Sequence, residues 1–232
     1  MVPLSWGLAQ SNNWISAYLM SKLNPSQFVQ LLHDYGINNP DIHASLSLCL
    51  GPCEVSVSEM VSAYTAFANH GIRTAPMFVS RIEDNEGNTI ATFQPRMNEV
   101  ISAESAYKMI VLLKGVVDGG TAGRLRYKYN FTGEIGGKTG TTNRNSDAWF
   151  MGVSPKLVVG AWVGGEYRCI HFRTGALGQG SRTALPICGY FWQYVMNDPA
   201  FQKYHGKFDK PHDEDIRSEE RRVGKECLRL CR

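Results

Sequence analysis

The chain has 232 residues, of which 43% are hydrophobic, so it can bury one substantial core and is not disordered throughout. Its formal net charge of +3 arises in residues 217–232, which carry six Lys/Arg and three Glu, and residues 1–216 are balanced. A neutral body without a basic run excludes an extended nucleic-acid surface. No apolar run approaches the roughly 20 residues that span a bilayer, and residues 1–10 lack the pattern of a signal peptide.

Helical patterns dominate the first half of the chain. Apolar spacing and boundary residues predict helices over residues 11–23, 24–37, 56–71 and 101–120. The second of these has Asn24 as N-cap and Pro25 at the first helical position. The third opens with Ser56 and Glu59 in capping-box spacing.

Strand-type sequence follows in two places. Residues 76–95 are typical of a hairpin around an Asn-Glu-Gly turn. Residues 134–142, 148–154 and 157–165 are joined by short connections, so we expect three adjacent antiparallel strands. A helix over 181–196 should pack near them. Helices, then neighbouring strands, then a closing helix indicate an α+β fold with an antiparallel sheet flanked by helices.

The stretch GEIGGKTGTT, residues 133–142, also resembles half of a phosphate-binding loop. Lys138 follows a glycine as the Walker A pattern requires, but Thr132 stands where the first glycine belongs and Gly133 is one residue out of register. A phosphate loop must also open a helix, whereas strand-type sequence follows here. The sequence therefore favours a strand.

The cysteines do not determine whether the protein resides in an oxidising or a reducing compartment. Cys49 and Cys53 are close enough to bridge a turn or to begin a zinc site, but no neighbouring Cys or His pair supplies further ligands, so no metal is expected. Buried free thiols are the favoured interpretation for these two and for Cys169 and Cys188. A Cys49–Cys53 disulfide is the alternative.

The C-terminal residues differ from the body. Residues 211–232 are polar, which predicts little fixed structure. Within them RSEERRVGKEC, residues 217–227, resembles the translation of a widely used sequencing adapter. We expect an artefact from residue 217, and a solvated charged extension is the alternative.

Two short motifs carry chemistry. Ser11-Asn12-Asn13 at the head of a predicted helix and Lys138-Thr139-Gly140 on a predicted strand match S-x-N and K-T-G of penicillin-binding proteins and serine β-lactamases. Further stretches follow in that family's order: LAQSNN, SEMVSAYTAFANHG, GGTAGRL, GKTGTTN, DAWFMGVSP, LVVGAWVGGE and ALPICGYF. From about residue 5 to residue 210, the sequence resembles the transpeptidase domain of class A, bifunctional penicillin-binding proteins.

The resemblance implies a penicillin-binding/serine-β-lactamase-like fold and acyl transfer on D-alanyl-D-alanine stem peptides of peptidoglycan, with β-lactam antibiotics as further ligands and no cofactor. Lys138 would supply a positive field and hold Ser11, whose hydroxyl would relay a proton to the departing amine. Asn13 would hydrogen-bond the peptide amide and orient the catalytic lysine. Taken alone, Ser11 would be an N-cap and Lys138 an edge-strand charge.

The same resemblance assigns substrate contacts to the rest of the K-T-G strand. Thr139 and Thr141 would bind the terminal carboxylate through their hydroxyls, and the Thr141 N–H would donate into an oxyanion hole. Gly140 would allow close approach because it has no side chain.

One family motif is not found where it belongs. The nucleophilic S-x-x-K precedes S-x-N in this family, and residues 1–10 do not contain it. We therefore expect residues 1–210 to be the C-terminal part of an incomplete transpeptidase domain, inactive alone. Its glycosyltransferase domain and membrane anchor would lie upstream, and the parent would act at the periplasmic face of the bacterial inner membrane. Ser105-Ala-Tyr-Lys108 has the spacing but lies between the other motifs, in a helix used for packing, so we interpret it as coincidence.

Three alternatives share the motifs: a β-lactamase, a β-lactam sensor domain and a non-catalytic remnant. Asp147-Ala-Trp149 and Trp162-Val-Gly164 match the synthetic enzymes better. A β-lactamase would also carry a Glu-x-x-x-Asn loop between the two motifs to activate water, and the sequence has none there.

Overall fold

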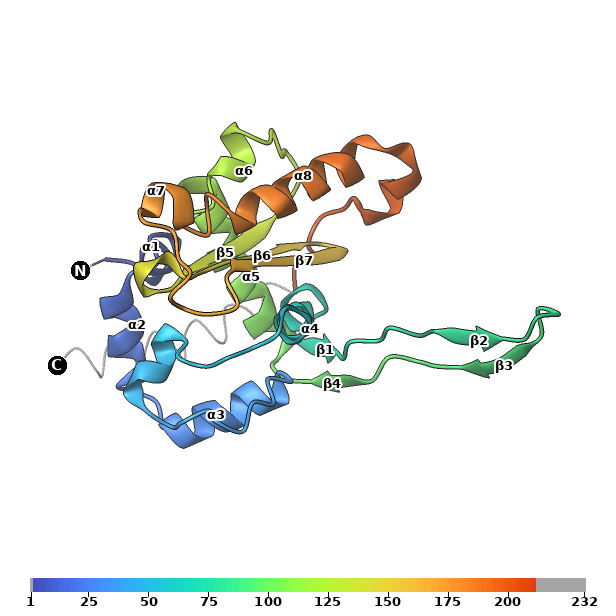
Figure 1. The fold of residues 1–232 in the computed structure, drawn as a ribbon, viewed down its shortest axis with the longest axis horizontal. Helices are drawn as coiled ribbons and strands as arrows, with labels where there is room; N and C mark the ends of the chain where they lie inside the picture. Colours follow the sequence, from blue (N-terminus) through green and yellow to red (C-terminus); the bar gives the residue numbers. More distant parts are fainter. Residues whose placement is uncertain (1, 212–232) are drawn as a thin grey trace.

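The fold is that of a computed structural model, which describes residues 2–211 (Figure 1). The predicted tail and its adapter-like stretch therefore lie, apart from residue 211, outside the described residues. Within the described part, none of the helices combines the length and apolar character needed to cross a membrane.

The four helices predicted before residue 121 are present, together with a first short helix and a 3-10 turn that were not predicted. In chain order they are α1 (Leu4–Ala9), α2 (Asn13–Met20), α3 (Pro25–Asp34), the 3-10 turn η1 (Leu46–Leu50), α4 (Val57–Ala68) and α5 (Ala103–Gly119). The Asn24 side chain caps α3, and Ser56 and Glu59 form the predicted capping box of α4. Interpreting Ser11 as an N-cap is wrong, because the neighbouring Asn12 accepts the Ile15 N–H and starts α2.

A three-stranded antiparallel sheet forms the centre. Its strands are β5 (Gly136–Thr141), β6 (Asp147–Ser154) and β7 (Leu157–Gly164), in the order β5-β6-β7. This confirms the three predicted neighbouring strands. The residues after Lys138 stay extended as far as Thr141, and only a single 3-10 turn, η2 (Asn143–Asn145), follows. The sequence thus continues as a strand where a phosphate loop would need a helix.

Helices cover both faces of this sheet (Figure 1). α4 and α5 pack on one side and α8 (Ala184–Asn197) on the other. The approach is close because the sheet is rich in glycine: a Cβ on Gly136 would lie 2.8 Å from Leu113, and one on Gly152 only 2.0 Å from the Trp192 ring. Trp192 is fully buried and contacts Phe150 edge-on, at the centre of the main core.

A narrow arm projects from the body (Figure 1). β1 (Ile72–Thr74) pairs with β4 (Met97–Glu99) at its base, and β2 (Arg81–Glu83) pairs with β3 (Thr89–Thr92) near its tip. The outer pair is the predicted hairpin. The chain is completed by α6 (Arg124–Tyr127), α7 (Gly175–Gly178) and η3 (Pro199–Tyr204).

The four cysteines of the described residues are free thiols. Cys188 is buried in α8, and Cys49 and Cys53 are half-buried. The prediction of a buried thiol is wrong for Cys169, which is exposed in the loop between β7 (Leu157–Gly164) and α7 (Gly175–Gly178).

Candidate active site

Ser11 and Lys138 meet although 127 positions separate them. The Lys138 Nζ donates to the Ser11 Oγ over 2.7 Å and to the Thr139 carbonyl over 2.8 Å. Ser11 lies in the tight turn between α1 and α2 with φ 53°, a left-handed conformation that costs a non-glycine residue about 1–3 kcal/mol. Such strain is typical of functional positions, and here it presents the hydroxyl to the lysine.

The electrostatics of Lys138 are unusual. Burial removes water from its ammonium group and lowers its pKa from 10.5 to about 8. The two groups that accept its hydrogen bonds are a hydroxyl and a peptide carbonyl, so neither brings a compensating charge. The lysine is therefore mostly charged at neutral pH, yet close enough to its pKa to exchange a proton.

The backbone of β5 exposes a hydrogen-bond donor at the edge of the sheet. Thr142 donates its N–H to the Asp147 carbonyl across the sheet, over 3.0 Å. Peptide groups alternate in direction along a strand, and β5 pairs with β6 without interruption from Gly136 to Thr141. The Thr141 N–H therefore points away from β6, toward the open edge of the sheet.

The threonine hydroxyls of the same strand have defined partners. The Thr141 Oγ1 accepts the Gly180 N–H at 3.0 Å, and the Thr139 Oγ1 lies 2.7 Å from the Thr121 Oγ1. A Cβ on Gly140 would lie 3.1 Å from the Cβ of Trp149, its partner on β6. The absence of a side chain there thus also serves the pairing of the two strands.

A polar network closes the turn between β5 and β6. Asp147 donates its N–H to the Thr142 Oγ1 over 2.8 Å, and its carboxylate accepts from Ser146 and from the Trp162 indole. The Asp-Ala-Trp and Trp-Val-Gly stretches singled out in the sequence thus hold the end of the K-T-G strand in place.

The other predicted residues lie as follows. Asn13 is the first residue of α2, exposed and two positions after Ser11. Ser105 lies in the first turn of α5, where its hydroxyl accepts from Ser102. Thr121, which contacts Thr139, follows the other end of α5, so about 20 Å of helix separates Ser105 from Thr121.

Sequence reasoning missed Thr121 and Gly180. Thr121 belongs to the GGTAGRL stretch that carried the family resemblance, but that stretch had no assigned role. Gly180, a single glycine in the short connection between α7 and α8, gave no signal. Both were found only through their contacts with Thr139 and Thr141.

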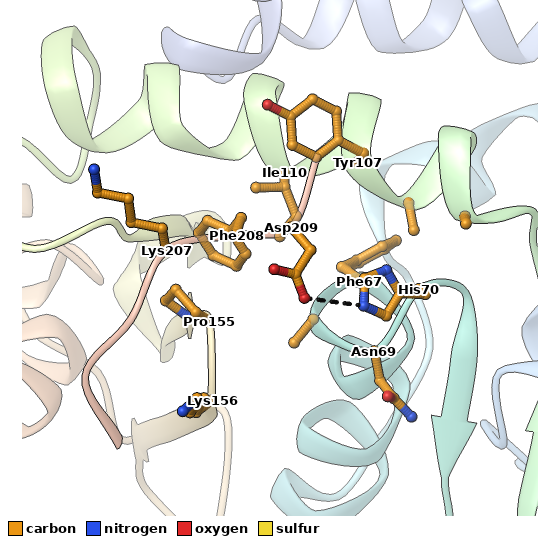
Figure 2. Close-up of a pocket in the computed structure, with 13 residues that line it drawn as sticks. Phe67, Asn69, His70, Tyr107, Ile110, Pro155, Lys156, Lys207, Phe208 and Asp209 are labelled. Carbon is orange, nitrogen blue, oxygen red and sulfur yellow. Dashed lines mark ion pairs between the residues drawn. The ribbon is translucent and has the colours of Figure 1, made fainter. Parts of the chain in front are cut away.

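A hollow lies elsewhere on the molecule, and the predicted site residues do not line it (Figure 2). The C-terminal segment crosses it, with the Asp209 carboxylate 3.6 Å from the His70 ring (Figure 2). The neighbouring Phe208 N–H donates to Glu134, which also accepts from Lys114. Among residues 2–211, His, Cys, Asp and Glu side chains form no group of three that could hold a metal ion.

Comparison with known families decides the relationship. Residues 2–163 match the model of the penicillin binding protein transpeptidase domain. The chain belongs to this family. It is 34% identical over 186 residues to penicillin-binding protein 1A of Aquifex aeolicus (strain VF5), covering 80% of this chain and 24% of that protein. Against penicillin-binding protein 1A of Neisseria meningitidis (strain MC58) the identity is 31% over 200 residues, covering 84% and 24%. The chain spans about a quarter of the length of these relatives.

Solved structures agree on the fold. Penicillin-binding protein 1A from Haemophilus influenzae has a TM-score of 0.81 at 24% identity, over 91% of this chain and 36% of that one. PonA1 of Mycobacterium tuberculosis in complex with penicillin V has a TM-score of 0.71 at 25% identity, over 90% and 59%. The predicted α+β, penicillin-binding-like fold and the resemblance to class A proteins are confirmed.

Proposed function

We propose that residues 1–210 form the C-terminal part of a peptidoglycan D,D-transpeptidase domain, which cross-links stem peptides by serine acyl transfer and binds β-lactams. The observation that carries the proposal is the 2.7 Å contact between Lys138 and Ser11 beside the open edge of β5. In this proposal the parent is a class A protein with a glycosyltransferase domain, anchored in the inner membrane and acting on its periplasmic face.

The proposed reaction has two halves. A serine in the upstream part of the domain gives its proton to a neighbouring base while its oxygen attacks the carbonyl of the penultimate D-alanine, and the Thr141 N–H stabilises the oxyanion. The C–N bond breaks, Ser11 passes its proton to the departing amine, and Lys138 can replace that proton. The amine of a second stem peptide then attacks the ester and gives its proton back to Ser11 and Lys138. The C–O bond breaks, the cross-link forms, and the serine recovers its proton from the neighbouring base.

Substrate binding uses the rest of the K-T-G strand. The Thr139 and Thr141 hydroxyls and the Lys138 charge receive the terminal carboxylate, while Gly140 leaves room along the strand. Asn13 hydrogen-bonds the peptide amide. Because Ser11 accepts from Lys138 and Thr141 accepts from Gly180, both hydroxyls keep their protons available for the substrate.

Labelling with a fluorescent penicillin tests this function. The 232-residue polypeptide alone should form no stable adduct, because it lacks an activated nucleophile. The same chain preceded by its upstream coding sequence should be labelled. In that longer protein Lys138→Ala or Ser11→Ala should slow labelling about 100-fold or more, and Ser105→Ala is the matched control that should leave it unchanged.

Three results would contradict the proposal. Labelling of the short chain that depends on Ser105 would identify a different nucleophile. An unlabelled longer protein would exclude a penicillin-reactive site. Rapid release of the label would instead identify a β-lactamase.

A further inference from the structure

The linker between α5 and α6 touches both halves of the candidate site. The Thr121 N–H donates to the carbonyl of Ala9 over 3.1 Å, at the end of α1 and two residues before Ser11. The Thr121 hydroxyl lies 2.7 Å from the Thr139 hydroxyl on β5. One residue thus joins the turn that carries S-x-N to the strand that carries K-T-G.

The linker between α5 and α6 packs closely against α1. A Cβ on Gly120 would lie 2.3 Å from the Ala9 carbonyl oxygen, so only glycine lets the linker approach this far. The Gln10 side chain donates to the Gly119 carbonyl over 3.2 Å, beside the bond made by Thr121. Two neighbouring hydrogen bonds therefore fix the position of Thr121 relative to the Ser11 turn.

The hydroxyls of Thr139 and Thr141, both on the K-T-G strand, each have a hydrogen-bonding neighbour. Thr141 accepts from the Gly180 N–H, a group that can only donate, so the Thr141 proton is left for another acceptor. The Thr139 hydroxyl likewise lies within hydrogen-bonding distance of the Thr121 hydroxyl. A hydroxyl has one proton, so if Thr139 donates to a carboxylate, Thr121 must donate to Thr139.

We infer that Thr121 is a positioning residue for carboxylate recognition: its hydroxyl donates to Thr139 and directs the Thr139 proton toward the terminal carboxylate of the substrate. The inference rests on the proposed function and adds a residue to it. Thr121 does not touch the substrate, and it acts through Thr139.

The test compares two ligands on the chain preceded by its upstream coding sequence. The second-order rate of acylation is measured with benzylpenicillin and with its methyl ester, which lacks the free carboxylate. Thr121→Val keeps the shape and removes the hydroxyl. It should slow the reaction with benzylpenicillin about 2- to 10-fold, the usual effect of losing a hydrogen bond between two neutral groups, and leave the slower ester reaction unchanged. Thr121→Ser keeps the hydroxyl and should react with benzylpenicillin at the wild-type rate.

Controls separate positioning from support of the fold. Thr92→Val, on the exposed arm, should change neither rate. An equal loss with both ligands, or no loss with either, would overturn the inference. If valine prevents folding, Thr121→Cys retains a weaker donor and should show a smaller loss confined to benzylpenicillin. A wild-type protein that does not distinguish the two ligands would refute carboxylate binding by Thr139, and hence that part of the proposed function itself.

Discussion

Lys138 keeps a charge in surroundings that solvate it poorly. Its partners, the Ser11 hydroxyl and the Thr139 carbonyl, are neutral dipoles, and burial lowers its pKa to about 8. A carboxylate arriving on the K-T-G strand would supply the missing opposite charge. The charged form of Lys138 is therefore less stable in an empty site than in a site occupied by a carboxylate.

This predicts a dependence of stability on pH. Between about pH 8 and pH 10.5 the unfolded lysine binds a proton that the folded lysine has released, so its contribution to the free energy of unfolding rises with pH in that window. Lys138→Met should be more stable than wild type below pH 8, by up to about 3 kcal/mol before solvent screening. The difference should shrink toward pH 10.5. Denaturation curves for both proteins across this range measure it, and a constant difference would contradict the assigned pKa.

The contact between Ser11 and Lys138 was predictable because a motif marks each residue. Ser11 and Lys138 belong to short strings with a known chemistry, and the fold brings them into contact. Thr121 and Gly180 are ordinary residues in irregular segments. Their importance depends on tertiary contacts with Thr139 and Thr141, which neither composition nor periodicity records.

At the scale of elements, the close contact between sheet and α8 depends on Gly152. Gly152→Ala should destabilise the protein by about 1–3 kcal/mol or more, because its methyl group would overlap the buried Trp192 ring. Gly115→Ala is the matched control: it lies in α5 with nothing near the added methyl, and should stabilise by about 0.5–1 kcal/mol. Urea unfolding compares the two. Similar changes in the free energy of unfolding for both variants would show that α8 does not pack tightly against the sheet at Gly152.

Glu134 connects three segments of the chain. Its hydrogen bond with Lys114 is the main cause of its lowered pKa, and the Phe208 N–H adds to it. The carboxylate therefore stabilises the fold above its ordinary pKa of about 4.5, and this contribution is lost as pH falls through the lower folded value. Glu134→Gln should cost about 1 kcal/mol at pH 7, or roughly 2–4 °C in Tm.

The pH dependence checks the cause. The difference in Tm between wild type and Glu134→Gln should disappear in acid, where the wild-type carboxyl is protonated. Glu86→Gln, at the exposed tip of the arm, is the control and should have little effect at any pH. A loss for Glu134→Gln that persists unchanged in acid would point to packing rather than charge.

Elements with strong local signals were predictable. The caps of α3 and α4 and the short connections of the central sheet are visible in the sequence. α1, α6 and α7 have four to six residues, and β1 and β4 have three, too few to show a period. These elements exist because tertiary contacts hold them.

The whole molecule divides into a packed body and an arm. The body places α4 and α5 on one face of the sheet and α8 on the other, while β2 and β3 extend away from it (Figure 1). The class of this architecture followed from the order of helices and strands. The position of the arm could not be predicted from the sequence. Alternation of apolar and polar residues indicates a hairpin but does not indicate the direction in which the hairpin leaves the body.

The arm should be dispensable for the stability of the body. Replacing residues 80–93 by a short glycine-containing turn should change the free energy of unfolding by less than about 1 kcal/mol, since loop length has a weak effect and the arm tip is mostly exposed. Thermal unfolding of the shortened protein measures this. A large loss would show that the arm contributes to the core.

The turn at the tip of this arm is itself well ordered. Asp84 accepts hydrogen bonds from the backbone N–H groups of Glu86 and Asn88 and from the Asn88 side chain. A probe attached at Asn85 would therefore lie on a defined turn, far along the chain from both Ser11 and Lys138. The arm therefore offers an attachment point for a fluorescent label that is separate from the residues of the candidate site.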